Sequence, residues 1–86
     1  MPEISVFYGI RITMYYRDHQ PPHFHAEYGD DEEVFEIATL ATYAGGLPRT
    51  ARRLVIAWAS LHQEELDAFW TLAQAQQPLS KIPPLP

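Results

Sequence analysis

The sequence predicts an α+β domain, in which a small antiparallel sheet is followed by a helical segment that packs on one face of the sheet. Residues 3–44 alternate apolar and polar side chains with the period of a strand. Residues 48–76 instead repeat apolar side chains every three or four positions, as an amphipathic helix does. The chain of 86 residues is long enough for one core, so we expect a single domain over 1–86. Residues 77–86 are proline-rich and are expected to form an extended tail.

The first two strands are predicted on either side of Gly9. Before it, one side of the segment carries Ile4, Val6 and Tyr8. After it, one face carries Ile10, Ile12, Met14 and Tyr16. Tyr8-Gly9 suits a tight hairpin, because glycine accepts the positive φ that such turns require.

A second hairpin is predicted from His23–Tyr28 and residues 33–38. The turn is expected within residues 29–32, which places His25 opposite Glu36. In this register Phe24 and Ala26 face the core, whereas the histidines lie on the other face. The acidic run at residues 30–33 is expected to be solvated at the hairpin tip.

The elements after the fourth strand leave two questions open. A short fifth strand near Thr42–Ala44 would extend the sheet from four strands to five. The helical segment begins at Pro48, which suits the first helical position. It is either one long helix or two helices that meet near Ser60, where Ser60 and Gln63 would form a capping box.

Composition and charge exclude several classes of protein. Eleven acidic residues against six basic ones give a net charge of −5, which disfavours direct binding of nucleic acid. No apolar run is long enough to span a membrane, and the first residues lack a secretion signal pattern. The chain has no cysteine, which fits a reducing compartment. We therefore expect a cytoplasmic protein.

The densest group of polar side chains lies between residues 18 and 27. Two histidines two positions apart on a strand project from the same face, and imidazole is a common metal ligand. The sequence therefore suggests a zinc-type site formed by three histidines and a carboxylate: His19, His23 and His25, with Asp18 or Glu27. His62 or Glu36 would lie behind these ligands, without binding the ion, and would orient them. Two alternatives stay open, namely a hydrogen-bonded polar cluster without metal and acid–base catalysis by the histidines.

A protein interface is the second kind of site that the sequence suggests. Exposed aromatic and arginine side chains are enriched at interfaces, and apolar side chains spaced by three line one side of the tail. That side of the tail would dock either on its own sheet or on a partner. The candidate interface residues are Arg11, Tyr15, Arg17, Glu36, Leu79, Ile82 and Leu85.

Several motifs resemble a family of small bacterial proteins known as domain-of-unknown-function family 4160. The most specific motif is Asp18-His19-x-Pro21-Pro22-His23-Phe24-His25-Ala26, and the others are Phe7-Tyr8-Gly9-Ile10, Met14-Tyr15-Tyr16, Tyr28-Gly29, Gly46-Leu47-Pro48-Arg49 and Trp58-x3-His62-x-Glu64-Glu65-Leu66. The family usually has a glycine-containing turn where this chain has Thr39-Leu40-Ala41, which weakens the case for a fifth strand. The resemblance implies a neighbouring gene of family 2442 and a toxin–antitoxin-like pair.

Two functions from different classes follow from these observations. The first is an interaction module that binds a small partner protein in a regulatory or toxin–antitoxin-like pair, with a homo-oligomer as a further option. The second is a zinc-type metal-binding protein or metal-dependent hydrolase that uses the histidine cluster. The sequence favours the interaction module and leaves open whether the protein is an enzyme.

Overall fold

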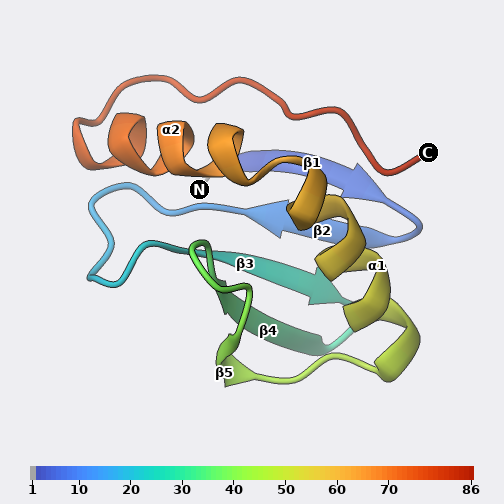
Figure 1. Ribbon diagram of the computed structural model, residues 1–86. Helices are drawn as coiled ribbons and strands as arrows, with labels where there is room; N and C mark the ends of the chain where they lie inside the picture. The colour runs from blue at the N-terminus through green and yellow to red at the C-terminus, as the bar shows by residue number, and fades with distance from the viewer. Residues whose placement is uncertain (1) are drawn as a thin grey trace.

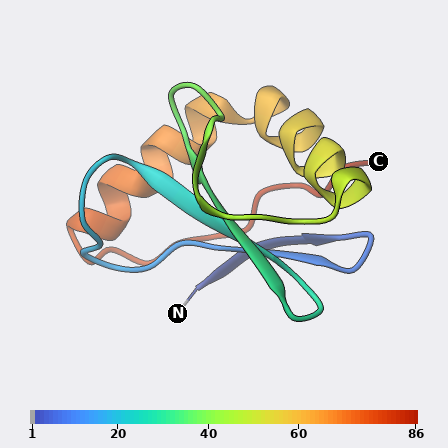
Figure 2. The ribbon, with the colours of Figure 1, turned by 90° about the horizontal axis from the view of Figure 1, so that it is seen from below.

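A computed structural model describes residues 2–86 and confirms the α+β class (Figure 1). One antiparallel sheet contains all five strands, which neighbour one another in chain order. The elements are β1 (Glu3–Phe7), β2 (Ile10–Thr13), β3 (His23–Tyr28), β4 (Asp31–Glu36), β5 (Thr42–Gly45), α1 (Arg49–Leu61) and α2 (Gln63–Gln74). Figure 2 shows both helices on the same side of the twisted sheet.

The first hairpin forms at the predicted position. Phe7 pairs with Ile10, so only Tyr8 and Gly9 lie in the turn. Both residues have positive φ, 50° and 77° respectively. Two consecutive residues of positive φ are typical of the tight turn that matches the twist of an antiparallel hairpin.

The predicted register of the second hairpin is wrong by two residues. The turn contains only Gly29 and Asp30, because Gly29 has a φ of 60° and Tyr28 already pairs with Asp31. His25 therefore lies opposite Val34, and it is His23 that lies opposite Glu36. A shift of two residues leaves every side chain on its predicted face, so Phe24 still faces the core and both histidines still lie on the other face.

The fifth strand is present despite the missing glycine. β5 pairs with β4, and the connection turns back through a hydrogen bond from the Glu36 N–H to the Ala41 carbonyl (2.9 Å). Leu40 adopts the positive φ of 60° that a glycine would adopt more easily. The side chain of Thr39 accepts a hydrogen bond from the Ala41 N–H (3.1 Å), which stabilises this turn.

The helical segment forms two helices. They meet at His62, two residues beyond the predicted junction, and the Ser60 hydroxyl instead donates to the Ile56 carbonyl within α1 (2.7 Å). The capping box at Ser60 is therefore wrong. Pro48 lies one residue before the helix, at the N-cap of α1. Neither helix in the described part of the chain is long and apolar enough to cross a membrane.

Aromatic side chains from the sheet and from α1 form the centre of the core. Trp58 is fully buried, with its ring centroid 5.4 Å from that of Phe7 and 6.0 Å from that of Phe24. Phe24 stacks in turn on Phe35 from the neighbouring strand. The helical spacing of Trp58 thus predicts its burial correctly.

The C-terminal residues lie along the edge of β1. The Ile82 N–H donates to the Ile4 carbonyl (2.8 Å), and the Trp58 indole donates to the Pro83 carbonyl (2.9 Å). Ile82 is buried, and Leu79 and Leu85 pack against the core from the same segment. These side chains are therefore engaged within the chain, which is one of the two arrangements expected for them.

Truncating Ile82 tests the importance of this contact. Ile82→Ala is expected to lower the free energy of unfolding by about 2 kcal/mol, because it leaves a cavity between β1 and the helices. The exposed Ser80→Ala is the control in the same segment and should stay within about 0.5 kcal/mol of the wild type. Urea unfolding followed by tryptophan fluorescence measures both values. Equal stability of the two variants would show that the segment adds little to the fold.

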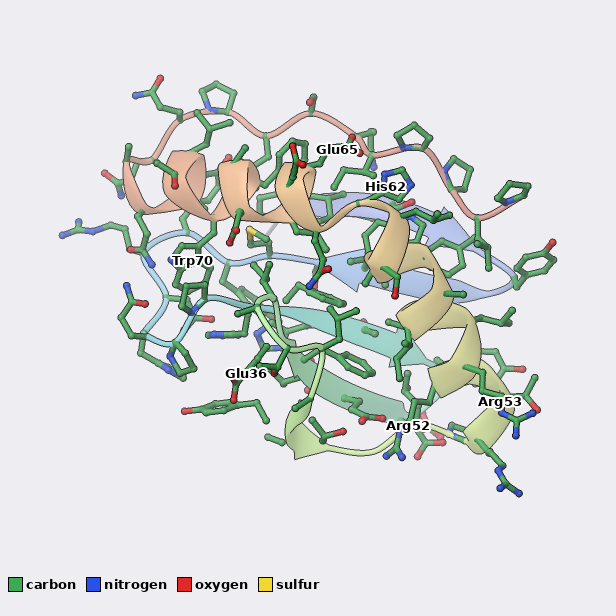
Figure 3. The ribbon with its side chains drawn as sticks, viewed as in Figure 1. Glu36, Arg52, Arg53, His62, Glu65 and Trp70 are labelled. Carbon is green, nitrogen blue, oxygen red and sulfur yellow. The ribbon has the colours of Figure 1, made fainter. Side chains whose placement is uncertain are left out.

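One member of the acidic run contradicts the prediction of a solvated tip. Glu33 is 0% exposed and lies on the core face of β4. Its carboxylate accepts hydrogen bonds from the Leu47 N–H (2.8 Å), from the Arg52 guanidinium (3.1 Å) and from the Thr42 hydroxyl. Glu33 thus joins the middle of the sheet to β5 and to the start of α1, and Figure 3 shows Arg52 reaching toward the sheet from that helix.

These contacts make the stability of the fold depend on pH. Burial alone would raise the pKa of Glu33, but the hydrogen bonds from Thr42, Leu47 and Arg52 outweigh burial and hold the pKa below its ordinary value of 4.5. The ionised carboxylate therefore stabilises the fold fully above pH 4.5, and this contribution is lost as the pH falls through the lower pKa of the folded state. Urea midpoints between pH 7 and pH 3 should fall more steeply for the wild type than for Glu33→Gln. If the urea midpoints of the wild type and of Glu33→Gln fell equally with pH, Glu33 would not be the source of this pH dependence.

Candidate metal centre

The loop between β2 and β3 folds back over the start of β3. Two contacts with the C-terminal end of α2 hold it there: the Arg17 N–H donates to the Ala73 carbonyl (3.3 Å), and the Gln74 amide donates to the Asp18 carbonyl (2.8 Å). The Asp18 side chain is thereby placed over the face of β3 that carries the histidines. Strand periodicity puts His23 and His25 on that face together.

Three side chains converge at this point. One carboxylate oxygen of Asp18, Oδ2, lies 2.8 Å from Nε2 of His23 and 3.6 Å from Nε2 of His25. Within the described residues, these three form a group whose possible ligand atoms all lie within 4.8 Å of one another. His23 is 1% exposed, whereas Asp18 and His25 are partly buried.

The other ring nitrogen of each histidine faces an oxygen acceptor. His23 Nδ1 lies 2.6 Å from the Pro21 carbonyl, and His25 Nδ1 lies 3.1 Å from a carboxylate oxygen of Glu32. A carbonyl and an ionised carboxylate can only accept, so we assign a proton to Nδ1 of each ring. In a neutral imidazole this leaves the lone pair on Nε2, directed at Asp18 in both cases.

If both imidazoles are neutral and carry their proton on Nδ1, no proton or positive charge lies between the two Nε2 atoms and the Asp18 carboxylate. A neutral His23 would direct a lone pair at an oxygen only 2.8 Å away, and the Nε2 of His25 is buried without a hydrogen-bond partner. Two states remove this conflict. In the first state Nε2 of one or both rings is protonated and donates to Asp18, and in the second a cation lies among the two Nε2 atoms and the Asp18 carboxylate.

The distance from Asp18 to His25 matches that between two ligands of a small divalent ion, whereas the distance from Asp18 to His23 is a hydrogen-bond distance that would lengthen when an ion binds. Zinc binds imidazole nitrogen and carboxylate oxygen at about 2.0–2.2 Å, so two ligands of a tetrahedral ion lie about 3.3–3.5 Å apart. The Asp18 Oδ2 to Nε2 distances of 2.8 and 3.6 Å lie on either side of that value. Donation of Nδ1–H to a carbonyl or carboxylate is also how metal-bound histidines are commonly oriented.

The protonation state of Asp18 suits a ligand. Burial alone would raise the pKa of its carboxyl, but the hydrogen bond from the His19 N–H and the contacts with His23 and His25 outweigh burial, and the pKa lies below its ordinary value of 3.8. Asp18 is therefore ionised at neutral pH. Its second oxygen, Oδ1, accepts the hydrogen bond from His19 (2.8 Å), which fixes the direction of Oδ2.

Aromatic rings from three other elements surround the cluster. Tyr43 of β5 stacks on His23 at a centroid distance of 5.7 Å, and Trp70 of α2 packs against the same ring at 5.1 Å. Tyr15 meets His25 edge-on at 4.5 Å. In Figure 3, Trp70 and Glu36 lie toward the same end of the molecule, whereas His62 lies at the helix junction. These contacts limit the freedom of both imidazoles.

Three other residues expected at the site lie beside the cluster or away from it. His19 is 63% exposed, and its Nε2 lies 3.6 Å from the far oxygen of Asp18. Glu27 lies further along β3 and pairs with Arg11 (3.7 Å). His62 contacts Glu65 (2.5 Å) at the helix junction. Of the two expected carboxylates, the structure therefore brings only Asp18 to the histidines.

The residues expected at an interface are largely engaged within the chain. Arg11 contacts Glu3 (3.2 Å) as well as Glu27, and Tyr15 covers His25. Arg17 is exposed beside Asp18, and Glu36 lies across from His23. Arg11 and Arg17 are the exposed members of the set, whereas Glu36 is partly buried.

Tyr43 and Trp70 were not among the expected site residues. Trp70 has the spacing of a core residue, and it is buried as that spacing predicts. Tyr43 lies on a strand whose four residues are all exposed, so no alternation of polar and apolar side chains marks it. Only the folding of β5 against β4 brings its ring to His23.

Comparison with known proteins gives one positive result. A family model described as "Domain of unknown function (DUF4160)" matches residues 9–71, which include β2 to β5, α1 and all three residues of the cluster. This match confirms the resemblance carried by the Asp-His-x-Pro-Pro-His-Phe-His motif. Searches of curated proteins and of solved structures returned no match.

Proposed function

The chain belongs to the DUF4160 family, and from the geometry of its cluster we propose that it binds one divalent metal ion, with zinc as the first candidate, through Asp18, His23 and His25. The observation that carries the proposal is the direction of the two rings. In both rings Nδ1 faces an oxygen acceptor and Nε2 faces the Asp18 carboxylate. Two imidazole nitrogens and a carboxylate oxygen are a common ligand set for zinc.

Three protein ligands leave a fourth position of a tetrahedral ion for water. That is the arrangement with which catalytic zinc lowers the pKa of a bound water and activates it for hydrolysis. Metal-dependent hydrolysis is therefore the reaction class that this proposal favours. We propose the cytoplasm as its location.

Metal content tests the proposal. Untagged protein is analysed by mass spectrometry as purified and after incubation with zinc followed by dialysis, beside the double variant His23→Ala/His25→Ala. The proposal predicts close to one ion per chain in the wild type and loss of the ion in the variant. Wild-type protein that retains no ion after incubation would contradict the proposal and favour protonation of Nε2 in one or both rings.

His19 supplies a matched control, because it is a histidine of the same motif. His19→Ala is expected to keep the full metal content, with a dissociation constant raised by no more than about a hundredfold, as for a residue that contacts a ligand without binding the ion. Isothermal titration with zinc measures the constant. Loss of stoichiometric binding in His19→Ala would place His19 among the ligands instead.

A second candidate function is the binding of a small partner protein, in a regulatory or toxin–antitoxin-like pair. The observation that favours it is the position of β5 at the end of the sheet, with all four of its residues exposed, Tyr43 among them. An added strand from a partner, or from a second copy of the chain, would extend the sheet there. Co-purification with the family 2442 protein at micromolar concentration, lost on Ala44→Pro in β5, would support this function. Separate elution of the two proteins would contradict it.

A further inference from the structure

Further carboxylates lie next to the Asp18–His23–His25 cluster. Glu32 accepts the Nδ1–H of His25 at 3.1 Å. Glu36 is the direct cross-strand neighbour of His23 on the same face of the sheet. Side chains in such a pair have Cβ atoms about 5 Å apart. An ion bound by the cluster would therefore be close to two carboxylates that do not bind it.

The basic side chains on this face do not supply an excess of positive charge. Arg11 is held between Glu3 (3.2 Å) and Glu27 (3.7 Å), and Lys81 also contacts Glu3 (3.1 Å), so this group of four is balanced. Arg17 adjoins Asp18 in the chain, and its side chain is exposed. A divalent ion and Arg17 together carry three positive charges, and the carboxylates of Asp18, Glu32 and Glu36 carry three negative ones.

We infer that an ion bound at this cluster takes an uncharged ligand in its open position and discriminates against phosphate and other anions. The inference rests on the proposed metal site and names its class of ligand. A site without net positive charge does not attract an anion electrostatically. The rings of Tyr43 and Tyr15 pack against the two imidazoles, so the neighbours of the cluster include aromatic surface as well as carboxylates.

Cobalt substitution makes the open position visible, because the absorption spectrum of bound Co²⁺ changes when its ligands change. The Co²⁺-loaded protein is titrated at pH 8 with imidazole, azide and inorganic phosphate in separate experiments. We expect imidazole to alter the spectrum with a dissociation constant at least about tenfold lower than that of azide, and phosphate to have no effect at millimolar concentration. Azide or phosphate binding as tightly as imidazole would overturn the inference.

Charge variants separate this effect from the intrinsic preferences of the ion. Glu36→Gln removes one charge near the site without removing a proposed ligand, and it should tighten azide binding about fivefold and leave imidazole unchanged. Asp30→Asn removes the same charge from the hairpin tip, about 20 Å along the strand from His23, and should change neither constant. Unchanged azide affinity in Glu36→Gln would overturn the inference. Failure of Co²⁺ to bind at all would overturn the proposed metal site itself, and the two failures are therefore distinguishable.

Discussion

Replacing Asp18 by asparagine is expected to weaken zinc binding by more than about a hundredfold, which is beyond the effect of losing a residue that only supports a ligand. The substitution removes the one negatively charged ligand and keeps the size of the side chain. Isothermal titration of the purified variant with zinc measures the loss. Retention of one tightly bound ion by Asp18→Asn would contradict the assignment of Asp18 as a ligand.

The same variant is expected to stay folded, which keeps the result interpretable. The amide oxygen of the substituted side chain can still accept the hydrogen bond from the His19 N–H that the Asp18 carboxylate accepts at 2.8 Å. The amide nitrogen of that side chain can donate to the Nε2 lone pairs of His23 and His25, which removes the conflict between acceptors. We therefore expect urea unfolding of the metal-free variant within about 1 kcal/mol of the metal-free wild type. Glu36→Gln, which alters a neighbouring carboxylate, should keep one zinc per chain.

Replacing Glu33 by alanine is expected to lower the free energy of unfolding by about 2–3 kcal/mol, as when a buried N–H loses a charged acceptor. The variant leaves the buried Leu47 N–H without its acceptor, and the exposed Thr42 loses its hydrogen bond as well. It also leaves Arg52 without its carboxylate partner (3.1 Å). For a domain of this size the loss is a large part of the total stability.

Two further variants test the physical reason for this effect. Glu33→Gln keeps the side-chain volume and one acceptor oxygen, so its loss should be about half that of the alanine variant. Glu64→Gln removes an exposed carboxylate from α2 and should change the stability by no more than about 0.5 kcal/mol. Urea midpoints at pH 7 measure all three. If Glu33→Ala and Glu64→Gln were equally stable, the contacts of Glu33 would make no net contribution to the free energy of unfolding.

The part of the site that lies within one strand could be predicted from the sequence. His23 and His25 are two residues apart on a strand, and that spacing alone places them on the face opposite Phe24. The choice between Asp18 and Glu27 as their carboxylate partner could not be made in this way. It depends on how the β2–β3 loop folds, and Gln74, 56 positions away in the chain, helps to hold that loop in place.

The features that the sequence did not predict have similar physical causes. The register of the second hairpin depends on which two residues adopt the turn, and Gly29-Asp30 and the residues after them are all typical of turns. The burial of Glu33 depends on donors from the residues before α1 and from α1 itself. Local periodicity predicts the elements and their faces, whereas partners supplied by distant segments decide which polar side chains are buried.

Anomalous diffraction at the zinc absorption edge, on crystals grown from zinc-loaded protein, tests the central claim most directly. The claim predicts one anomalous peak per chain at about 2.0–2.2 Å from a carboxylate oxygen of Asp18 and from Nε2 of both His23 and His25. It also predicts that Nδ1 of each ring keeps its contact with Pro21 or Glu32. The absence of a peak among these three side chains, with His23 hydrogen-bonded directly to Asp18 in the zinc-soaked crystal, would contradict the claim.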